Sequence, residues 1–132
     1  IKDKTVHITT ISMGNPHAVL FVDDLEKADV KAIGPLIETH DRFPEKTNVE
    51  FVEVINKEEL KMKVWERGAG ITLACGTGAC AALVAANLTG RAKNNAIVHL
   101  SGGDLDIHWD KETNHIFKTG PATLVFEGCI RI

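Results

Sequence analysis

The sequence predicts an α+β domain in which a mostly antiparallel sheet curls around one buried helix, with a second helix outside. The first observation is a run over residues 77–88 in which nearly every side chain is small or apolar. A surface helix shows a polar stripe, so a helix that is apolar all round belongs inside the protein. The second observation is that short β-rich runs precede and follow this helix. The 132 residues suffice for one domain with its own core, which we expect to span residues 1–132.

Two strands are expected at the start of the chain. Residues 5–12 are rich in β-branched side chains, and residues 18–22 form a short apolar run. Gly and Asn-Pro signals within residues 13–17 place a turn between these two strands.

The outer helix is predicted from a helical pattern that follows Asp29. The residues that share its apolar face are Val30, Ile33, Leu36 and Ile37. Gly34 and Pro35 fall inside this pattern, and a proline is tolerated in the first turn of a helix. The proline therefore favours a helix that begins only at Pro35, followed by a polar connection over residues 40–46.

The middle of the chain predicts a central pair of strands. Residues 48–56 place apolar side chains on both faces of an extended chain, which indicates a strand covered on both sides. Residues 60–65 alternate in the same way and are expected to pair back through a turn at residues 57–58. This second strand leads into a glycine-rich loop that begins with Glu66 and Arg67.

The end of the chain reads as four more strands after the buried helix. Gly90 is expected to stop that helix. The predicted strands cover residues 97–100, 105–109, 115–118 and 122–132, and turn residues separate them.

The composition favours a protein of the cytoplasm that acts on small molecules. A net charge of −3 without a basic patch argues against nucleic acid, and no apolar run approaches the roughly 20 residues that span a bilayer. Three cysteines are an odd number, which argues against a disulfide-stapled secreted domain and favours a reducing compartment. The chain begins at Ile1, so its natural start is expected upstream.

Cys75 is the leading candidate for a reactive group, because it precedes the buried helix in a glycine-rich stretch. A helix N-terminus presents unpaired N–H groups and a positive dipole end, which favours a bound anion or a thiolate of lowered pKa. Thr77 is expected to cap the helix with its hydroxyl. The competing interpretation is a tight turn before a core helix, with Cys75 as a small buried hydrophobic residue. Cys80 and Cys129 are expected to pack in the core.

Five further residues are candidates for binding or catalysis. Asn15 and His17 lie on the first turn, although a lone histidine is more often structural. Glu66 and Arg67 are adjacent and should point to opposite sides of an extended chain, towards different parts of a ligand or towards solvent. Asn48 is either a turn residue or an amide that faces a ligand. The other histidines are scattered without the spacing typical of zinc sites, so no metal is expected.

Four of these stretches together resemble the C-terminal half of the diaminopimelate epimerase family. They are MGNPH (residues 13–17), TNVEF (47–51), WERGAG (65–70) and ACGTGAC (74–80). One such stretch is weak evidence, but four in the family's order and spacing are specific. The resemblance covers nearly the whole chain. Related proline racemases and a family of cofactor-free isomerases share the fold but lack this combination.

The resemblance implies an epimerase that converts LL-2,6-diaminopimelate to the meso form without a metal or any other cofactor. Two pseudo-symmetric halves each present one cysteine, one as thiolate and one as thiol, and Cys75 would be one of them. The N–H groups of Gly76 and Thr77 would bind the reacting carboxylate. Glu66 would hold the reacting ammonium.

The resemblance also implies roles for the remaining candidates. Arg67, Asn15 and Asn48 would grip the distal amino-acid end of diaminopimelate, and His17 would support the acid–base groups through Glu66. The family's N-terminal half is absent from this chain, so it is an expected partner, and the chain alone should be inactive. A homodimer is compatible with this assignment. The alternatives are a cofactor-independent racemase or isomerase of another substrate and a non-catalytic binding domain on the same fold.

Overall fold

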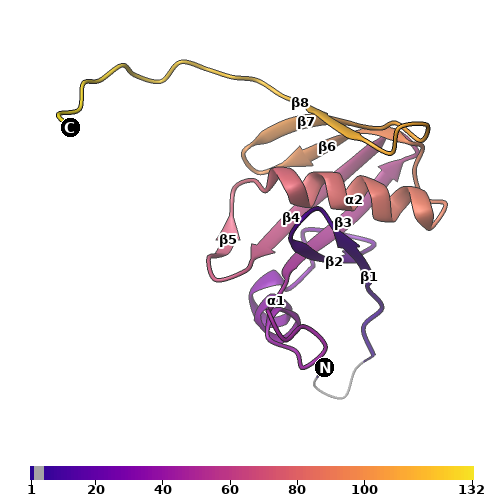
Figure 1. The fold of residues 1–132 in the computed structure, drawn as a ribbon. Helices are drawn as coiled ribbons and strands as arrows, with labels where there is room; N and C mark the ends of the chain where they lie inside the picture. The colour runs from indigo at the N-terminus through magenta and orange to yellow at the C-terminus, as the bar shows by residue number, and fades with distance from the viewer. Residues whose placement is uncertain (2–4) are drawn as a thin grey trace.

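The computed structural model describes residue 1 and residues 5–132, and within them the chain forms one eight-stranded sheet and two helices (Figure 1). The helices are α1 (Val30–Glu38) and α2 (Gly76–Leu88). The strands are β1 (Thr9–Ser12), β2 (Pro16–Phe21), β3 (Asn48–Asn56), β4 (Glu59–Glu66), β5 (Gly70–Thr72), β6 (Asn95–Leu100), β7 (Gly103–Trp109) and β8 (Ile116–Thr119).

The sheet is mostly antiparallel, as predicted. Its order is β1-β2-β3-β4-β6-β7-β8, and β5 pairs with β4 beside this path. Two of the pairings, β2 with β3 and β4 with β6, are parallel, and the others are antiparallel. Each parallel pairing follows a crossover that contains a helix, which is the connection that parallel neighbours require.

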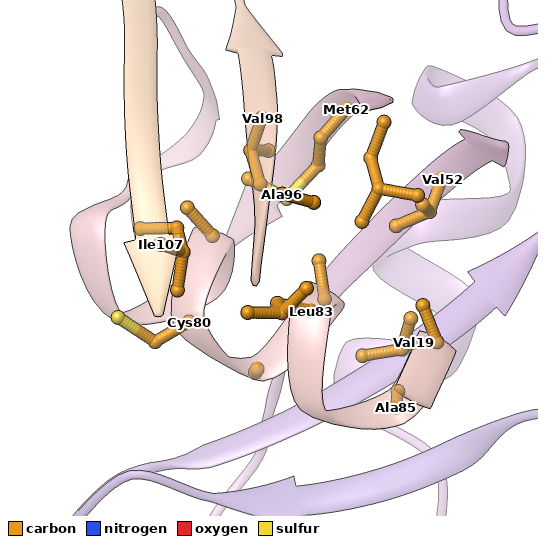
Figure 2. Close-up of a cluster of buried hydrophobic side chains, with 14 of the residues drawn as sticks. Val19, Val52, Met62, Cys80, Leu83, Ala85, Ala96, Val98 and Ile107 are labelled. Atoms are coloured by element: carbon orange, nitrogen blue, oxygen red, sulfur yellow. The ribbon is translucent and has the colours of Figure 1, made fainter. Parts of the chain in front are cut away.

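Helix α2 lies inside the curve of the sheet, which confirms the prediction of a buried helix (Figure 1). All residues from 78 to 86 are buried. Strands from both ends of the sheet contact the helix. Figure 2 shows Leu83 and Ala85 of the helix among side chains of the strands between those ends, β2, β3, β4, β6 and β7. Alanine side chains dominate the helix, so the strands can approach it closely from several directions. Gly90, at a φ of 71°, follows the end of the helix as expected.

Helix α1 lies on the outside of β3 and β4 and begins earlier than predicted. Its first residue is Val30, because Asp29 caps the helix by accepting a hydrogen bond from the Ala32 N–H at 3.0 Å. The expected start at Pro35 is wrong. A residue before proline is pushed out of the helical region mainly by its Cβ, and here that residue is Gly34, which has none.

Strand β3 is covered on both faces, as its sequence predicts. Val49 and Phe51 pack in the core cluster under α1, whereas Val52 packs in the cluster around α2. Its first five residues are all buried, and Glu50 is among them.

Other strand boundaries differ from the prediction. Strand β1 covers only residues 9–12 of the predicted run 5–12, and the short strand β5 was not predicted at all. Strand β5 lies within the glycine-rich loop, where it pairs antiparallel with the end of β4. Long-range pairing with β4, rather than local propensity, creates it.

The predicted strand over residues 122–132 is wrong. After β8 the chain leaves the domain as an extended tail without strand pairing, and residues 120–132 are exposed (Figure 1). A β-rich sequence forms a strand only beside a neighbouring strand, and the tail meets none among the described residues. Cys129 lies in this tail and is exposed, so its predicted burial is wrong as well.

Candidate functional site

The site begins at the N-terminus of α2, where Cys75 is the N-cap residue. Its backbone is extended, and its sulfur accepts a hydrogen bond from the Gly78 N–H at 3.3 Å. The Cys75 carbonyl accepts the first helical bond from Ala79 at 2.9 Å. The helix therefore starts at Gly76, and the expected cap by Thr77 is wrong because the preceding sulfur already occupies the capping position.

The Cys75 thiol is not the low-pKa group that its place at a helix end suggests. Burial raises its pKa above the ordinary value, and only 7% of the residue is exposed. Hydrogen bonds from Thr77 and Gly78 lower the pKa, while the negative charges of Glu66 and Glu50 raise it further. The effect of burial is the larger one, because the free-energy cost of removing the thiolate from water exceeds the stabilisation that the two hydrogen bonds give it.

The turn between β1 and β2 lies against this helix end. Asn15 donates from Nδ2 to Thr77 Oγ1 at 3.4 Å, and Thr77 Oγ1 lies 3.6 Å from Cys75 Sγ. Gly14 permits the turn, since its φ is 90°. The structure therefore brings Asn15, Thr77 and Cys75 together, although Asn15 is 62 positions away from Thr77.

His17 is completely buried and binds a carboxylate other than the expected one. Its Nδ1 lies 2.6 Å from Glu50 Oε1, and both side chains are 0% exposed. Its Nε2 lies 3.0 Å from Asn15 Oδ1. The expected partner, Glu66, is engaged elsewhere. The parallel register of β2 and β3 makes the pair with Glu50 local, since His17 aligns with Asn48, two residues before Glu50.

Glu50 is the functional candidate that the sequence analysis missed. Burial raises the pKa of its carboxyl group, and the hydrogen bond and charge of His17 act in the opposite direction. The signal was a glutamate within the first residues of a strand that is apolar on both faces. A charged group in such a strand needs a partner, and charged groups are almost never fully buried without one.

Glu66 and Arg67 contact different parts of the site, as expected for adjacent residues on an extended strand. Glu66 accepts a short hydrogen bond from the Thr72 hydroxyl of β5. Arg67 donates from its guanidinium to the Glu45 carbonyl at 3.1 Å. Its backbone N–H donates to Asn48 Oδ1 at 2.9 Å.

Asn48 uses its amide to join backbone segments. Besides accepting from Arg67, it donates from Nδ2 to the Pro16 carbonyl at 3.0 Å, and it is 5% exposed. The structure thus gives it a role in holding the end of β4 against the start of β2. Contact with a ligand stays a prediction for this residue.

A second buried carboxylate supports the loop that carries Glu66 and Arg67. Glu38 at the end of α1 accepts from Trp65 Nε1 at 2.6 Å and from the Gly68 N–H at 2.9 Å. The hydrogen bond from Trp65 is the main reason that the pKa of Glu38 lies below its ordinary value. Helix α1 therefore fixes both sides of the turn that follows β4.

Lys118 of β8 also reaches the start of α2. Its ammonium lies where a side chain on Gly76 would begin, and its charge lowers the pKa of Cys80, which burial raises overall. The sequence analysis gave Lys118 no role, because only the curl of the sheet brings β8 to this helix end. The positive charge adds to the positive end of the α2 dipole.

Asn15 and His17 also line an open hollow of about 610 Å³, together with residues 10–12 and 42–46. Its lining contains the basic residues Arg42 and Lys46 and the acidic residue Glu45. Cys75 is not among its lining residues. In the described part of the chain, no three His, Cys, Asp or Glu side chains are grouped so that they could hold a metal ion. Neither helix described here has the length and apolarity needed to cross a membrane.

The fold is an α+β half-domain that recurs in solved structures of other proteins. A PhzF-family phenazine biosynthesis protein of Bacillus anthracis matches with a TM-score of 0.58 at 18% identity, over 86% of this chain and 38% of that one. One from Enterococcus faecalis matches with a TM-score of 0.58 at 12% identity, over 81% and 40%. At this identity the likeness concerns the fold alone.

The chain belongs to the diaminopimelate epimerase family, whose model matches residues 9–125. A diaminopimelate epimerase of Desulforapulum autotrophicum is 65% identical over all of this chain and 47% of the relative. One of Moorella thermoacetica is 56% identical over 97% of this chain and 46% of the relative. The chain thus spans about half the length of the curated relatives it matches.

Proposed function

We propose that this chain is the C-terminal half of a diaminopimelate epimerase, which converts LL-2,6-diaminopimelate to the meso form without a cofactor. One observation carries this proposal. In a chain of this family, Cys75 caps the buried helix α2, so its sulfur lies at the positive end of that helix. The alternative substrates named above have no observation of their own in support.

The reaction inverts one carbon that carries a weakly acidic C–H bond, and it needs two acid–base groups on opposite faces. One cysteine, as thiolate, takes the α-proton and becomes a thiol. The other, as thiol, gives its proton to the opposite face and becomes a thiolate. No electrons are transferred, and the proton count is unchanged. Cys75 is one of the pair, and because burial raises its pKa the thiol, hence the proton donor, is its resting form.

The reacting carboxylate binds at the N-terminus of α2 in this proposal. The N–H groups of Gly76 and Thr77 lie in the first turn, where a helix offers no internal acceptor. The ammonium of Lys118 beside Gly76 adds positive charge. Negative charge that builds up on the carboxylate during deprotonation is therefore stabilised where it develops.

The other site residues hold the rest of the substrate. Glu66 places a negative charge near Cys75, which suits the ammonium on the reacting carbon. Arg67, Asn15 and Asn48 grip the distal amino-acid end. His17 supports the acid–base group through Asn15 rather than through Glu66, since its contacts run that way.

A second half supplies the opposite cysteine. The curated relatives are about twice as long as this chain, which supports a partner domain within the same polypeptide. The exposed apolar side chains of the tail offer surface that such a domain can cover. They are Leu124, Val125, Phe126, Ile130 and Ile132. Three free cysteines suit the reducing cytoplasm, where we place the protein.

Replacing the sulfur tests the proposal. In the complete polypeptide that contains this chain, Cys75→Ala should lower the turnover of LL-diaminopimelate by about 10²–10⁴-fold or more, because one of two proton-transfer groups is lost. The interconversion is followed by chiral chromatography. Cys80→Ala is the matched control, since Cys80 packs in the core, and it should keep most of the activity.

Unchanged turnover in folded Cys75→Ala would remove the proposal. A substrate panel separates the alternative racemases. Proline has no distal amino-acid end for Arg67 to bind, so the complete polypeptide should not racemise it.

A further inference from the structure

Glu50 is a buried carboxylate at the centre of the molecule that the proposed mechanism does not use. It and His17 are both 0% exposed, and its Oε2 has no hydrogen-bond partner among the residues that the structure describes. Burying such a group is costly, so an ordinary strand position does not account for it. The question is what the carboxylate holds in place.

Gly78 shows how close this carboxylate comes to the reactive sulfur. A Cβ built on Gly78 would lie 2.9 Å from Glu50 Oε1 and 3.2 Å from Cys75 Sγ. The carboxylate and the thiol therefore approach the same point under the first turn of α2. The missing side chain of Gly78 makes room for this approach.

A continuous chain of contacts also connects the two groups. Glu50 Oε1 lies 2.6 Å from His17 Nδ1, and His17 Nε2 lies 3.0 Å from Asn15 Oδ1. Asn15 Nδ2 donates to Thr77 Oγ1 at 3.4 Å, and Thr77 Oγ1 lies 3.6 Å from Cys75 Sγ. This series of contacts starts at the buried Glu50 carboxylate and ends at the Cys75 sulfur.

The hydrogen bonds between His17 and Cys75 all run in one donor-to-acceptor direction. His17 Nε2 faces an amide oxygen, which only accepts, so this nitrogen carries a proton. That holds whether the proton between Glu50 and Nδ1 sits on the oxygen or on the nitrogen. Asn15 is thereby fixed with its NH₂ towards Thr77, and the Thr77 oxygen accepts from it. The Thr77 hydroxyl proton is left to point at the Cys75 sulfur.

We infer that Glu50 is a positioning residue for Cys75. By binding His17 Nδ1 it sets the donor-to-acceptor direction of this series of hydrogen bonds, so that the Thr77 hydroxyl donates to the sulfur. This inference rests on the proposed function only in taking Cys75 as the acid–base group. A donated hydrogen bond stabilises the thiolate over the thiol. The series of hydrogen bonds thus lets the buried Cys75 thiol ionise during turnover.

Without a partner on Nδ1, His17 can expose a bare Nε2 to Asn15. The amide of Asn15 then turns round, and the Thr77 hydroxyl donates to Asn15 instead of to the sulfur. Loss of one hydrogen bond to a charged atom shifts a protonation equilibrium by about one pH unit or more.

The test compares Glu50→Met with Glu50→Gln. Methionine fills the space but leaves Nδ1 without a partner, whereas glutamine can still hydrogen-bond Nδ1. Both variants also remove the negative charge of Glu50, which raises the pKa of Cys75, so this change is common to the two and the difference between them reports the hydrogen bond to Nδ1. The other ionisable groups around the sulfur, which both variants keep, are Glu66 of β4, Cys80 of α2 and Lys118 of β8.

The readout is the pH dependence of iodoacetamide labelling of Cys75 in the complete polypeptide, located by tandem mass spectrometry. The rise in labelling should lie about one pH unit higher in Glu50→Met than in Glu50→Gln. In a Thr77→Val background the two Glu50 variants should give coincident profiles, because the hydroxyl that donates to the sulfur is gone. Glu53→Met is the matched control on β3, since Glu53 instead accepts from the Leu25 N–H.

Coincident labelling profiles of folded Glu50→Met and Glu50→Gln would overturn the inference. Should Glu50→Met not fold, ¹⁵N NMR of His17 in the wild type decides, since a bare Nε2 overturns the inference and a protonated one supports it. Labelling needs no substrate. Coincident profiles of the two variants therefore speak against Glu50 alone, whereas inactivity of the complete wild-type polypeptide towards diaminopimelate speaks against the proposed function.

Discussion

Cys75 is subject to two opposing influences. Its place at the start of α2 and its two hydrogen bonds favour the thiolate, while burial and the carboxylates of Glu66 and Glu50 favour the thiol. The balance raises its pKa. In the absence of substrate the sulfur is therefore protonated at neutral pH, which protects it from oxidation and alkylation.

This balance predicts the pH dependence of Cys75 labelling. Its pKa lies above the ordinary value of 9.0, so the thiolate fraction grows with pH throughout the neutral and mildly alkaline range. The iodoacetamide rate at Cys75 should rise about tenfold between pH 7 and pH 8 and should still be rising at pH 9.

A small thiol such as free cysteine, labelled in parallel, is the control and should begin to level off near its lower pKa. A plateau for Cys75 below pH 8 would show instead that the helix end outweighs burial.

Single residues were predictable where local chemistry decides their role. The helix start beside Cys75 and the turn with Asn15 follow from glycine, proline and periodicity, whereas His17, expected on that turn, belongs to strand β2. The partner of His17 could not be predicted from the local sequence, because Glu50 reaches His17 only through the pairing of β2 with β3. The direction of the Cys75 pKa also depends on burial by distant segments, which no local pattern reports.

At the scale of elements, α1 fits against β4 because Gly34 has no side chain. A Cβ on Gly34 would lie 2.6 Å from Cγ and 2.7 Å from Cβ of Trp65. The same tryptophan is held by Glu38 one turn further along α1. The helix thus presses directly on the strand that delivers Glu66 and Arg67.

Gly34→Ala should destabilise the protein. The usual gain of about 0.5–1 kcal/mol from replacing glycine by alanine in a helix is reduced here, because a Cβ before Pro35 disfavours the helical conformation, and overpacking against Trp65 costs about 1–3 kcal/mol. The clash involves Trp65 Cβ, which cannot move without the backbone of β4, so the cost should dominate. Urea unfolding should show a lower midpoint.

Lys31→Ala, at an exposed position of the same helix, is the control and should leave the midpoint nearly unchanged. Equal stability of Gly34→Ala and the wild type would mean that α1 can shift away from β4.

At the scale of the whole molecule, the sheet wraps α2 but leaves the domain with an unpaired tail. The tail exposes apolar side chains and pairs with no strand among the described residues (Figure 1). The proposed acid–base site has one cysteine at the helix end, while Cys80 lies on the same helix and Cys129 in the tail. Neither is placed to act from the opposite face of a substrate bound at that end.

The isolated 132-residue chain should therefore show no turnover of LL-diaminopimelate. The reason is that one thiol can remove a proton but cannot return it to the other face. Chiral chromatography, which separates the LL and meso forms, measures this directly. The complete polypeptide is the positive control, and measurable epimerisation by the isolated chain would contradict the prediction.

The sequence by itself determined the buried helix, the mostly antiparallel sheet around it and the location of the thiol, because periodicity, glycine and proline act locally. Only the tertiary structure decided which carboxylate holds His17, that Lys118 reaches the helix end, that the tail stays unpaired and that the Cys75 pKa rises. These features depend on strand pairing and burial between segments far apart in the chain, and no local pattern encodes them.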